Sequence, residues 1–452
     1  MAATANPLRP LAGAPRPYHF PDFVRSNLPN GMTIWVVPLA SGAVVNVHLL
    51  VDAGAAAEDE PHAGVAALTA QLLVTGTQRL DASAFAEATE RLGIEVSSES
   101  SWDLARAAFQ ALPEHTEAGI ALLAEMVREP RLDAGEFERL KAERLADILQ
   151  ARADAGRLAD EMFLRHVFDA TTPYRRLSAG TPETVGELTL DDVRSHHATH
   201  WGPGTANLIV AGPVEPDAVV AAAERHLGDW SGGGAGHRDF ASRVAGDRRV
   251  VIIDRPDSVQ TELRVGHLGI QRRSERYFPA LVLGALLGGT FGSRLNKRLR
   301  EELGYTYGAR AGFDPRRAIG PFNASAAVQT DVTADALREM VEIMTHMRDA
   351  APEDAELREV RDFLVGVFPL RFETTGGVAM AVEPVAVYGL PDDYWQTYRQ
   401  HLEAVGSNEV LDAARALLEP DRFLMVAVGD AAQIRADLQA ADLGPVSVSS
   451  PD

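Results

Sequence analysis

Histidines are the first side chains in this sequence whose type and spacing could do chemistry. His196 and His200 stand four residues apart beside His197, a spacing that lets two imidazoles on one helix chelate zinc. No glutamate lies between them to act as a base, and Gly202-Pro203 would close the helix just beyond. A helix C-terminus also favours histidine through its dipole. We therefore expect structural histidines here and a loop position for His62, with a self-sufficient hydrolase as the weakest alternative.

The stretch Gly284–Gly292 (GALLGGTFG) is rich in glycine and could form a binding loop. It lacks the lysine and hydroxyl residue that end a phosphate-binding loop, so nucleotide binding is not indicated. Two interpretations stay open: a flexible loop beside a substrate, or a loop between two packed helices.

Composition excludes several classes of function. The net charge is −21, which argues against binding to nucleic acid or to an anionic membrane, because such surfaces must be basic. The sequence contains 0 cysteines, which excludes disulfides and thiolate metal sites. No apolar run reaches membrane-spanning length, and the segment Met1–Pro17 lacks the apolar core of a signal peptide. A cytoplasmic protein is the expectation.

At 452 residues the chain should hold at least two domains. The glycine-rich segment Ser231–His237 is the clearest linker candidate. We expect an N-terminal tail over residues 1–19, a first domain over 20–230, a linker over 231–247 and a second domain over 248–445.

The two halves repeat one plan, which indicates an internal duplication. Val193 to Gly212 and Val410 to Gly429 each carry a helix and then an apolar strand, with the same separation of 19 residues. A long helix with an acidic start precedes each pair, from Asp133 and from Asp354. Each half also opens with strand signals, at 32–38 and 44–51 in the first half and at 249–253 and 261–267 in the second. The fold class expected is α+β: two homologous domains, each a largely antiparallel sheet with helices on one face.

An ordered set of short motifs resembles the pitrilysin-type metallopeptidases, a family that includes insulinase-like and mitochondrial-processing-peptidase-like enzymes. The resemblance extends over nearly the whole chain. It rests on Leu28-Pro29-Asn30-Gly31, Val51-Asp52-Ala53-Gly54, the frame Gly64–Thr77, Thr172-Pro173-Tyr174, Gly180-Thr181 and the segment Leu299–Tyr307.

The family frame at Gly64–Thr77 holds the inverted zinc motif H-x-x-E-H, and its chemistry is missing here. Ala67 and Gln71 replace the two histidines, and Ala70 replaces the glutamate that would activate a metal-bound water. The third zinc ligand of the family, a glutamate on a later helix, falls at Gln150, or at Asp147 in a shifted alignment. A lone carboxylate without histidines would not make a zinc site.

The Leu299–Tyr307 segment resembles the family's second contribution to catalysis. In members built from two different chains, the chain without zinc supplies an arginine and a tyrosine, and these match Arg300 and Tyr307. A helix ending at Gly304 would leave Arg300 in its last turn and Tyr307 on the next strand, free to converge. Guanidinium and phenol donors can hold peptide carbonyls and an oxyanion. The resemblance also implies a substrate loop at Gly288, Gly289 and Gly292.

The resemblance therefore implies the non-catalytic subunit of a heterodimeric zinc metalloendopeptidase. Zinc is expected in a homologous H-x-x-E-H partner and none in this chain, which alone should be inactive. A sheet edge would hold the peptide as an added strand. The alternative is a structural or peptide-binding scaffold of the same fold without protease function.

Overall fold

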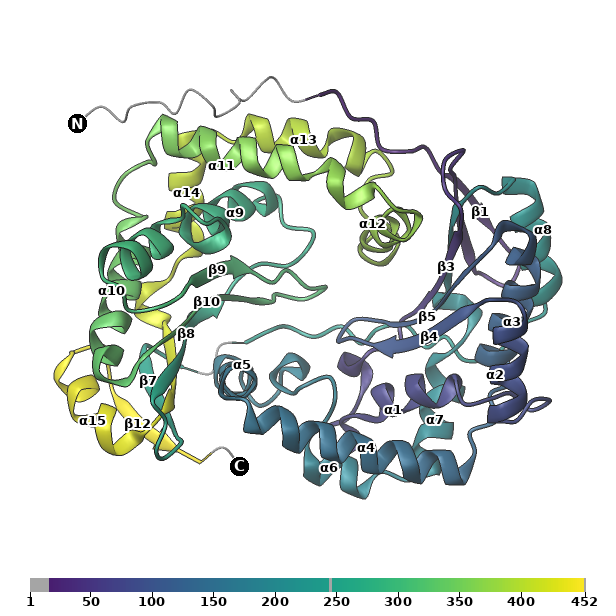
Figure 1. Cartoon of the computed structure of the whole chain (residues 1–452), viewed down its shortest axis with the longest axis horizontal. Helices are drawn as coiled ribbons and strands as arrows, with labels where there is room; N and C mark the ends of the chain where they lie inside the picture. Colours follow the sequence, from purple (N-terminus) through teal and green to yellow (C-terminus); the bar gives the residue numbers. More distant parts are fainter. Residues whose placement is uncertain (1–15, 244–245, 451–452) are drawn as a thin grey trace.

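The computed structural model describes residues 16–243 and 246–450 and forms two halves that face each other (Figure 1). The strands of the first half are β1 (Val24–Asn27), β2 (Thr33–Pro38), β3 (Val45–Val51), β4 (Glu95–Ser100), β5 (Ala105–Ala111) and β6 (Asn207–Gly212). Its helices are α1 (Val65–Leu73), α2 (Ala82–Arg91), α3 (Thr116–Arg128), α4 (Ala134–Ala153), α5 (Ala155–Val167), α6 (Pro182–Glu187), α7 (Leu190–His200) and α8 (Pro216–Leu227).

The second half repeats these elements after the 231–247 segment. Its strands are β7 (Arg249–Asp254), β8 (Gln260–Leu268), β9 (Ala309–Phe313), β10 (Pro321–Gln329), β11 (Leu424–Gly429) and β12 (Val446–Ser449). Its helices are α9 (Tyr277–Gly284), α10 (Thr333–His346), α11 (Asp354–Val367), α12 (Thr375–Tyr388), α13 (Tyr394–Ala404), α14 (Ser407–Leu417) and α15 (Ala431–Ala440). Within the described ranges, no helix is both long and apolar enough to span a bilayer.

The two sheets share one topology, which confirms the predicted α+β fold with two homologous halves. The strand orders are β1-β2-β6-β3-β5-β4 and β12-β7-β11-β8-β10-β9, so each strand from β2 to β6 has a counterpart. Both sheets are largely antiparallel, with three parallel pairs as exceptions. These are β2 with β6, β7 with β11, and the added edge strand β12 with β7.

Both faces of each sheet are buried, whereas the sequence predicted helices on one face only. In β2, Ile34 and Val36 pack into the core of the first half, while Trp35 and Val37 join the core built by the second half. Alternate residues of a strand point to opposite faces, so the two clusters lie on opposite sides of the sheet. The second face is covered by a helix from the other half: α12 packs on β3 and β6, and α5 packs on β8 and β11 (Figure 1).

Each exchanged helix contacts the strand it covers through a carboxylate. Glu383 of α12 lies 2.7 Å from His48 of β3, and Asp160 of α5 lies 2.5 Å from Arg264 of β8. His48 and Arg264 occupy equivalent strands of the two sheets. The two halves are therefore held together by reciprocal contacts that follow the internal duplication.

A buried carboxylate adds a third tie between the halves. Asp103, in the turn between β4 and β5, accepts hydrogen bonds from Tyr174 (2.5 Å), Tyr388 (3.2 Å) and the backbone N–H of Arg317 (2.9 Å). Three segments far apart in the sequence thus meet at one acceptor, which fixes how the second half sits on the first.

Candidate functional site

Helix α1 carries the three positions where the sequence lacks the zinc motif. Ala67 and Ala70 are buried, with exposed fractions of 7% and 0%. Gln71 is partly buried, and its Oε1 atom is enclosed without a hydrogen-bond partner. The helix face that would hold a metal is therefore closed by two methyl groups and one amide.

The residue of α4 that faces α1 is neither of the two predicted ones. Gln150 is exposed, and it lies on the side of α4 opposite Ile148, because two residues turn a helix by about 200°. Ile148 is 4% exposed and packs in one apolar cluster with Leu68 and Leu72 of α1. Asp147 is exposed beside that face. Ile148 therefore clusters with Leu68 and Leu72 and not with Ala67 or Ala70, and which residue of α4 replaces the third ligand stays a prediction.

The residues at this position do not fit zinc. Alanine and isoleucine offer no donor atom, and an amide oxygen alone is a poor ligand for this ion. Among the described residues, no group of three or more histidines and carboxylates is arranged to hold a metal. The space between α1 and α4 is an apolar contact rather than a metal cradle.

A buried carboxylate supports the first turn of α1. Glu58 is 6% exposed, and its carboxylate accepts hydrogen bonds from the backbone N–H groups of Gly64 (3.1 Å) and Ala66 (2.7 Å). Burial raises the pKa of Glu58 to about 7, and the two N–H donors oppose that shift. Glu58 therefore caps the helix and changes its charge near neutral pH.

The histidine cluster on α7 is built into the protein interior. His196 Nε2 lies 3.3 Å from the carbonyl of Ala53, and His197 Nε2 lies 2.8 Å from that of Val127. The rings of His196 and His200 are 4.7 Å apart. Burial lowers the pKa of His196 to about 3, so this ring is neutral at physiological pH. These contacts favour the structural interpretation.

Arg300 projects from the π-helical segment η7 (Asn296–Glu302) and stacks on an aromatic ring. Its guanidinium carbon lies 4.4 Å from the centre of the Phe291 ring, and that ring is 70% exposed. The segment ends before Gly304, which has a φ of 68° in the left-handed region. Arg300 lies in the last turn, as predicted, and its charge sits at the molecular surface.

Tyr307 lies in a loop two residues before β9, where the sequence predicted a strand. Thr306 Oγ1 accepts from the N–H of Gly308 (3.2 Å) and donates to its carbonyl (3.0 Å), and this local turn keeps the chain out of the sheet. The tyrosine is 95% exposed, and no described residue hydrogen-bonds to its hydroxyl. Among the described residues, the ring on which Arg300 stacks is that of Phe291 and not that of Tyr307.

Two bidentate ion pairs anchor the segment that carries Arg300. Arg294 binds Glu356 of α11 with two bonds of 2.8 Å, and Arg298 binds Glu339 of α10 with bonds of 2.8 and 2.7 Å. Leu299 is fully buried between them. The backbone that carries Arg300 is therefore held in place by these contacts.

The non-helical loop is shorter than the glycine-rich stretch Gly284–Gly292 over which a loop was predicted. Gly288 and Gly289 belong to a second π-helical segment, η6 (Ala285–Gly289), that continues α9. Only the turn from Thr290 through Gly292 to Ser293 is non-helical. Gly288 is required by packing, since a Cβ there would overlap the backbone nitrogen of Ala311 in β9. A substrate role for Gly288, Gly289 and Gly292 stays a prediction.

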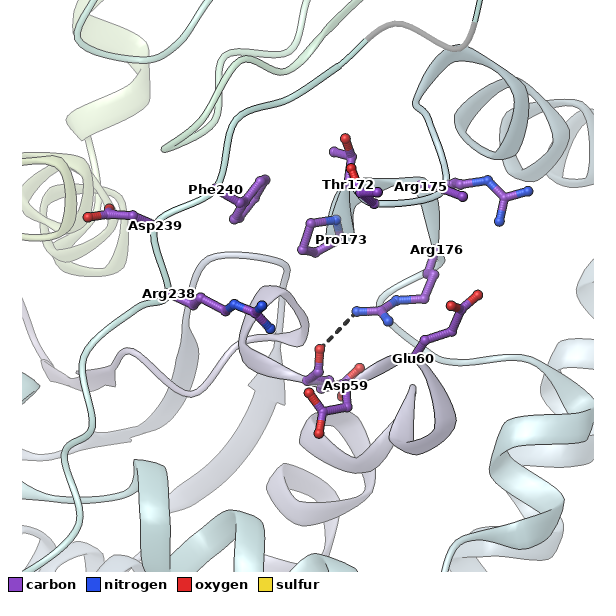
Figure 2. A pocket seen from close by; sticks show the side chains of 12 residues that line it. Asp59, Glu60, Thr172, Pro173, Arg175, Arg176, Arg238, Asp239 and Phe240 are labelled. Atoms are coloured by element: carbon purple, nitrogen blue, oxygen red, sulfur yellow. Dashed lines mark hydrogen bonds between the residues drawn. The ribbon is translucent and has the colours of Figure 1, made fainter.

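A polar cavity of about 240 Å³ lies apart from both predicted sites (Figure 2). It is bounded by the turn around Asp59, by the 172–176 segment and by the linker near Arg238. Arg176 donates to the carbonyl of Glu58 at its edge (3.0 Å). Acidic and basic side chains line it together, so its charges do not select one class of ligand.

Sequence reasoning missed three residues of these sites. Phe291 lies inside the glycine-rich stretch, and only its exposure in the folded chain indicates a role in binding. Asn296 is a polar residue in a charged helix and gave no signal, yet it is buried. The capping role of Glu58 could not be predicted from the sequence, because an irregular segment separates this residue from the start of α1.

Comparisons with known proteins place the chain in a family. Residues 36–178 match the sequence profile described as "Insulinase (Peptidase family M16)", and residues 187–364 match "Peptidase M16 inactive domain". A non-peptidase homolog, YmxG, of Helicobacter pylori is 25% identical over 82% of this chain and 86% of its own length. An uncharacterized zinc protease of Mycobacterium leprae is 26% identical over 77% and 79%.

Solved structures show the same fold. A peptidase M16 inactive domain from Pseudomonas fluorescens superimposes with a TM-score of 0.82 and 24% identity, covering 90% of this chain and 98% of its own. A protease from Helicobacter pylori gives a TM-score of 0.82 with 18% identity, covering 91% and 100%. The chain belongs to the insulinase family of peptidases, family M16, as a non-catalytic member.

Proposed function

We propose that this chain is the non-catalytic subunit of a heterodimeric zinc metalloendopeptidase. The partner is a homologous chain that carries H-x-x-E-H and holds the zinc. This chain supplies Arg300 and Tyr307 to peptide binding and to stabilisation of the charge that develops on the scissile carbonyl. The Gly288–Gly292 region borders the same surface and would lie near the substrate.

The observation that carries this proposal is the contrast between the two half-sites of one chain. Two of the positions predicted for the zinc motif hold Ala67 and Ala70, which are buried and apolar. By contrast, Tyr307 is 95% exposed without a partner, and Arg300 lies on an exposed Phe291 ring. Exposed aromatic and arginine side chains that meet at one place are typical of surfaces that bind another molecule.

These side chains suit the chemistry of peptide cleavage. A guanidinium and a phenol are hydrogen-bond donors, and donors aimed at a carbonyl oxygen lower the energy of the oxyanion that forms there. β4 and β9 are the edge strands of the two sheets, and β9 begins two residues after Tyr307, where Asn296 already binds the N–H and C=O of Ala309. An extended peptide could add to such an edge through its backbone, so that Tyr307 and Arg300 reach its carbonyls.

The test is peptidase activity and zinc content of this chain alone, of an H-x-x-E-H homologue alone, and of their mixture. We expect a zinc-free and inactive single chain, and chelator-sensitive peptide cleavage in the mixture. Chelator-sensitive activity of the single chain would overturn the proposal. Absence of both association and activity in the mixture would favour the scaffold alternative.

A further inference from the structure

Asn296 is the most connected polar side chain near the Arg300 surface. It opens η7, is 7% exposed, and its amide bonds three residues in two separate segments. Its Nδ2 donates to the carbonyl of Thr290 (3.1 Å), to Ser293 Oγ (3.1 Å) and to the carbonyl of Ala309 (2.9 Å). Its Oδ1 accepts from the N–H of Ala309 (2.8 Å).

Among the described residues, no other side chain hydrogen-bonds to both of these segments. The Thr290–Ser293 turn holds Phe291, the ring beneath Arg300. Ala309 begins β9 and ends the loop that carries Tyr307. One buried amide therefore sets the separation between the ring under Arg300 and the base of the Tyr307 loop.

The hydrogen-bonding groups around position 296 require an asparagine side chain. Ala309 presents both a donor and an acceptor, so its partner must accept and donate at once, which a side-chain amide does and a carboxylate does not. An apolar residue would leave the N–H and C=O of Ala309 without partners in a buried site, which is costly. Glutamine is longer by one methylene in a position that is already enclosed.

We propose that Asn296 is a positioning residue for the Arg300 and Tyr307 pair, acting by locking the Phe291 turn to the first residue of β9. This inference rests on the proposed function for its effect on catalysis. Its structural part stands independently, because the ion pairs of Arg294 and Arg298 hold η7 to α11 and α10 by themselves. Removing the Asn296 amide should therefore release the two loops while η7 stays in place.

The experiment compares the full-length chain with its Asn296→Asp and Asn296→Ala variants. Asn296→Asp is nearly isosteric and keeps the acceptor for Ala309, so it covers the case in which the alanine variant fails to fold. Ser293→Ala, which removes only one of the three acceptors, is the matched milder control. The first readout is hydrogen exchange of backbone amides, and it needs no partner chain.

We expect amide exchange in 290–293 and 304–309 to accelerate by about tenfold or more in Asn296→Asp, with exchange in α10 unchanged. Unchanged exchange in both loops would overturn the inference whatever the activity of any mixture. Faster exchange throughout the second half would also overturn it, because Asn296 would then serve general stability.

The second readout is a double-mutant cycle with Arg300→Ala in the active mixture. If Asn296 acts by positioning Arg300 and Tyr307, Asn296→Asp should slow the Arg300→Ala chain less than it slows the wild type, because one of the two positioned side chains is already absent. Losses that multiply would show that the two residues act separately and would overturn the positioning role. If the wild-type mixture is inactive, the proposed function fails, and the exchange measurement still decides the structural part.

Discussion

The guanidinium carbon of Arg300 lies 4.4 Å from the centre of the Phe291 ring, so a surface cation is stacked on a surface aromatic side chain. Such a contact at an exposed site stabilises the pair by about 0.5–1 kcal/mol. We predict that Phe291→Ala leaves thermal stability nearly unchanged but lowers kcat/KM of the mixture by a few-fold, because Arg300 loses its preferred orientation. Phe291→Tyr should retain the wild-type value, and equal losses in the two variants would contradict the stacking role.

Gly288 and Gly289 offer a matched pair for the packing of η6 on β9. A methyl group at 288 would overlap the backbone of Ala311, whereas at 289 its nearest neighbour is the Cβ of Ala285 at 3.4 Å. We predict that Gly288→Ala lowers the free energy of unfolding by about 1–3 kcal/mol, since overpacking must move the strand. Gly289→Ala should change it by no more than about 0.5 kcal/mol. Denaturant unfolding of both variants, followed through the second half, would measure this difference.

Reinstating the zinc motif tests whether the site is closed by packing as well as by missing ligands. The variant Ala67→His/Ala70→Glu/Gln71→His places larger side chains at two buried positions and one partly buried position of α1. We predict a lower unfolding midpoint and substoichiometric zinc by elemental analysis, because the third ligand is still absent. Adding a glutamate on α4, at position 148 or at the predicted position 150, should raise zinc content. Full zinc occupancy without such a glutamate would contradict the prediction that α4 lacks the third ligand.

Glu58 should leave a mark on the pH dependence of stability. Burial raises its pKa from the ordinary value of 4.5 to about 7 in the folded chain, so between these values the folded state holds more protons than the unfolded state. The contribution of Glu58 to stability is therefore greatest at low pH and is lost as the pH rises towards 7. We predict that, from pH 5 to pH 7.5, the free energy of unfolding of the wild type falls relative to that of the Glu58→Gln variant. If the difference in unfolding free energy between the two chains did not depend on pH, the conclusion that Glu58 is buried and protonated would be contradicted.

Much of the fold follows from local signals in the sequence. The apolar run at Leu208–Ala211 and its counterpart at 424–428 form strands, and Asp133 caps α4 by accepting from the N–H groups of Gly135 and Glu136. The exchange of α5 and α12 could not be foreseen. An amphipathic helix shows that one face is buried, but not which of two equivalent sheets buries it.

The candidate site shows the same limit at the level of single residues. Gln150 and Ile148 differ by two positions in an alignment, yet on α4 they face opposite ways, so a small shift exchanges a buried residue for an exposed one. Asn296 was missed because a polar residue in a charged helix is usually solvated. Its four hydrogen bonds depend on segments brought together only by the folded chain.

The most direct test of the central claim is kcat/KM of the mixture with Arg300→Ala in this chain. The matched control is Arg310→Ala, an exposed arginine on β9. We predict that Arg300→Ala lowers kcat/KM by about tenfold or more, as expected for the loss of a charged donor to the transition state, while association with the partner is retained. Arg310→Ala should stay near the wild-type value. Equal activity of the Arg300→Ala and wild-type mixtures would contradict the claim that this chain donates half of an active site.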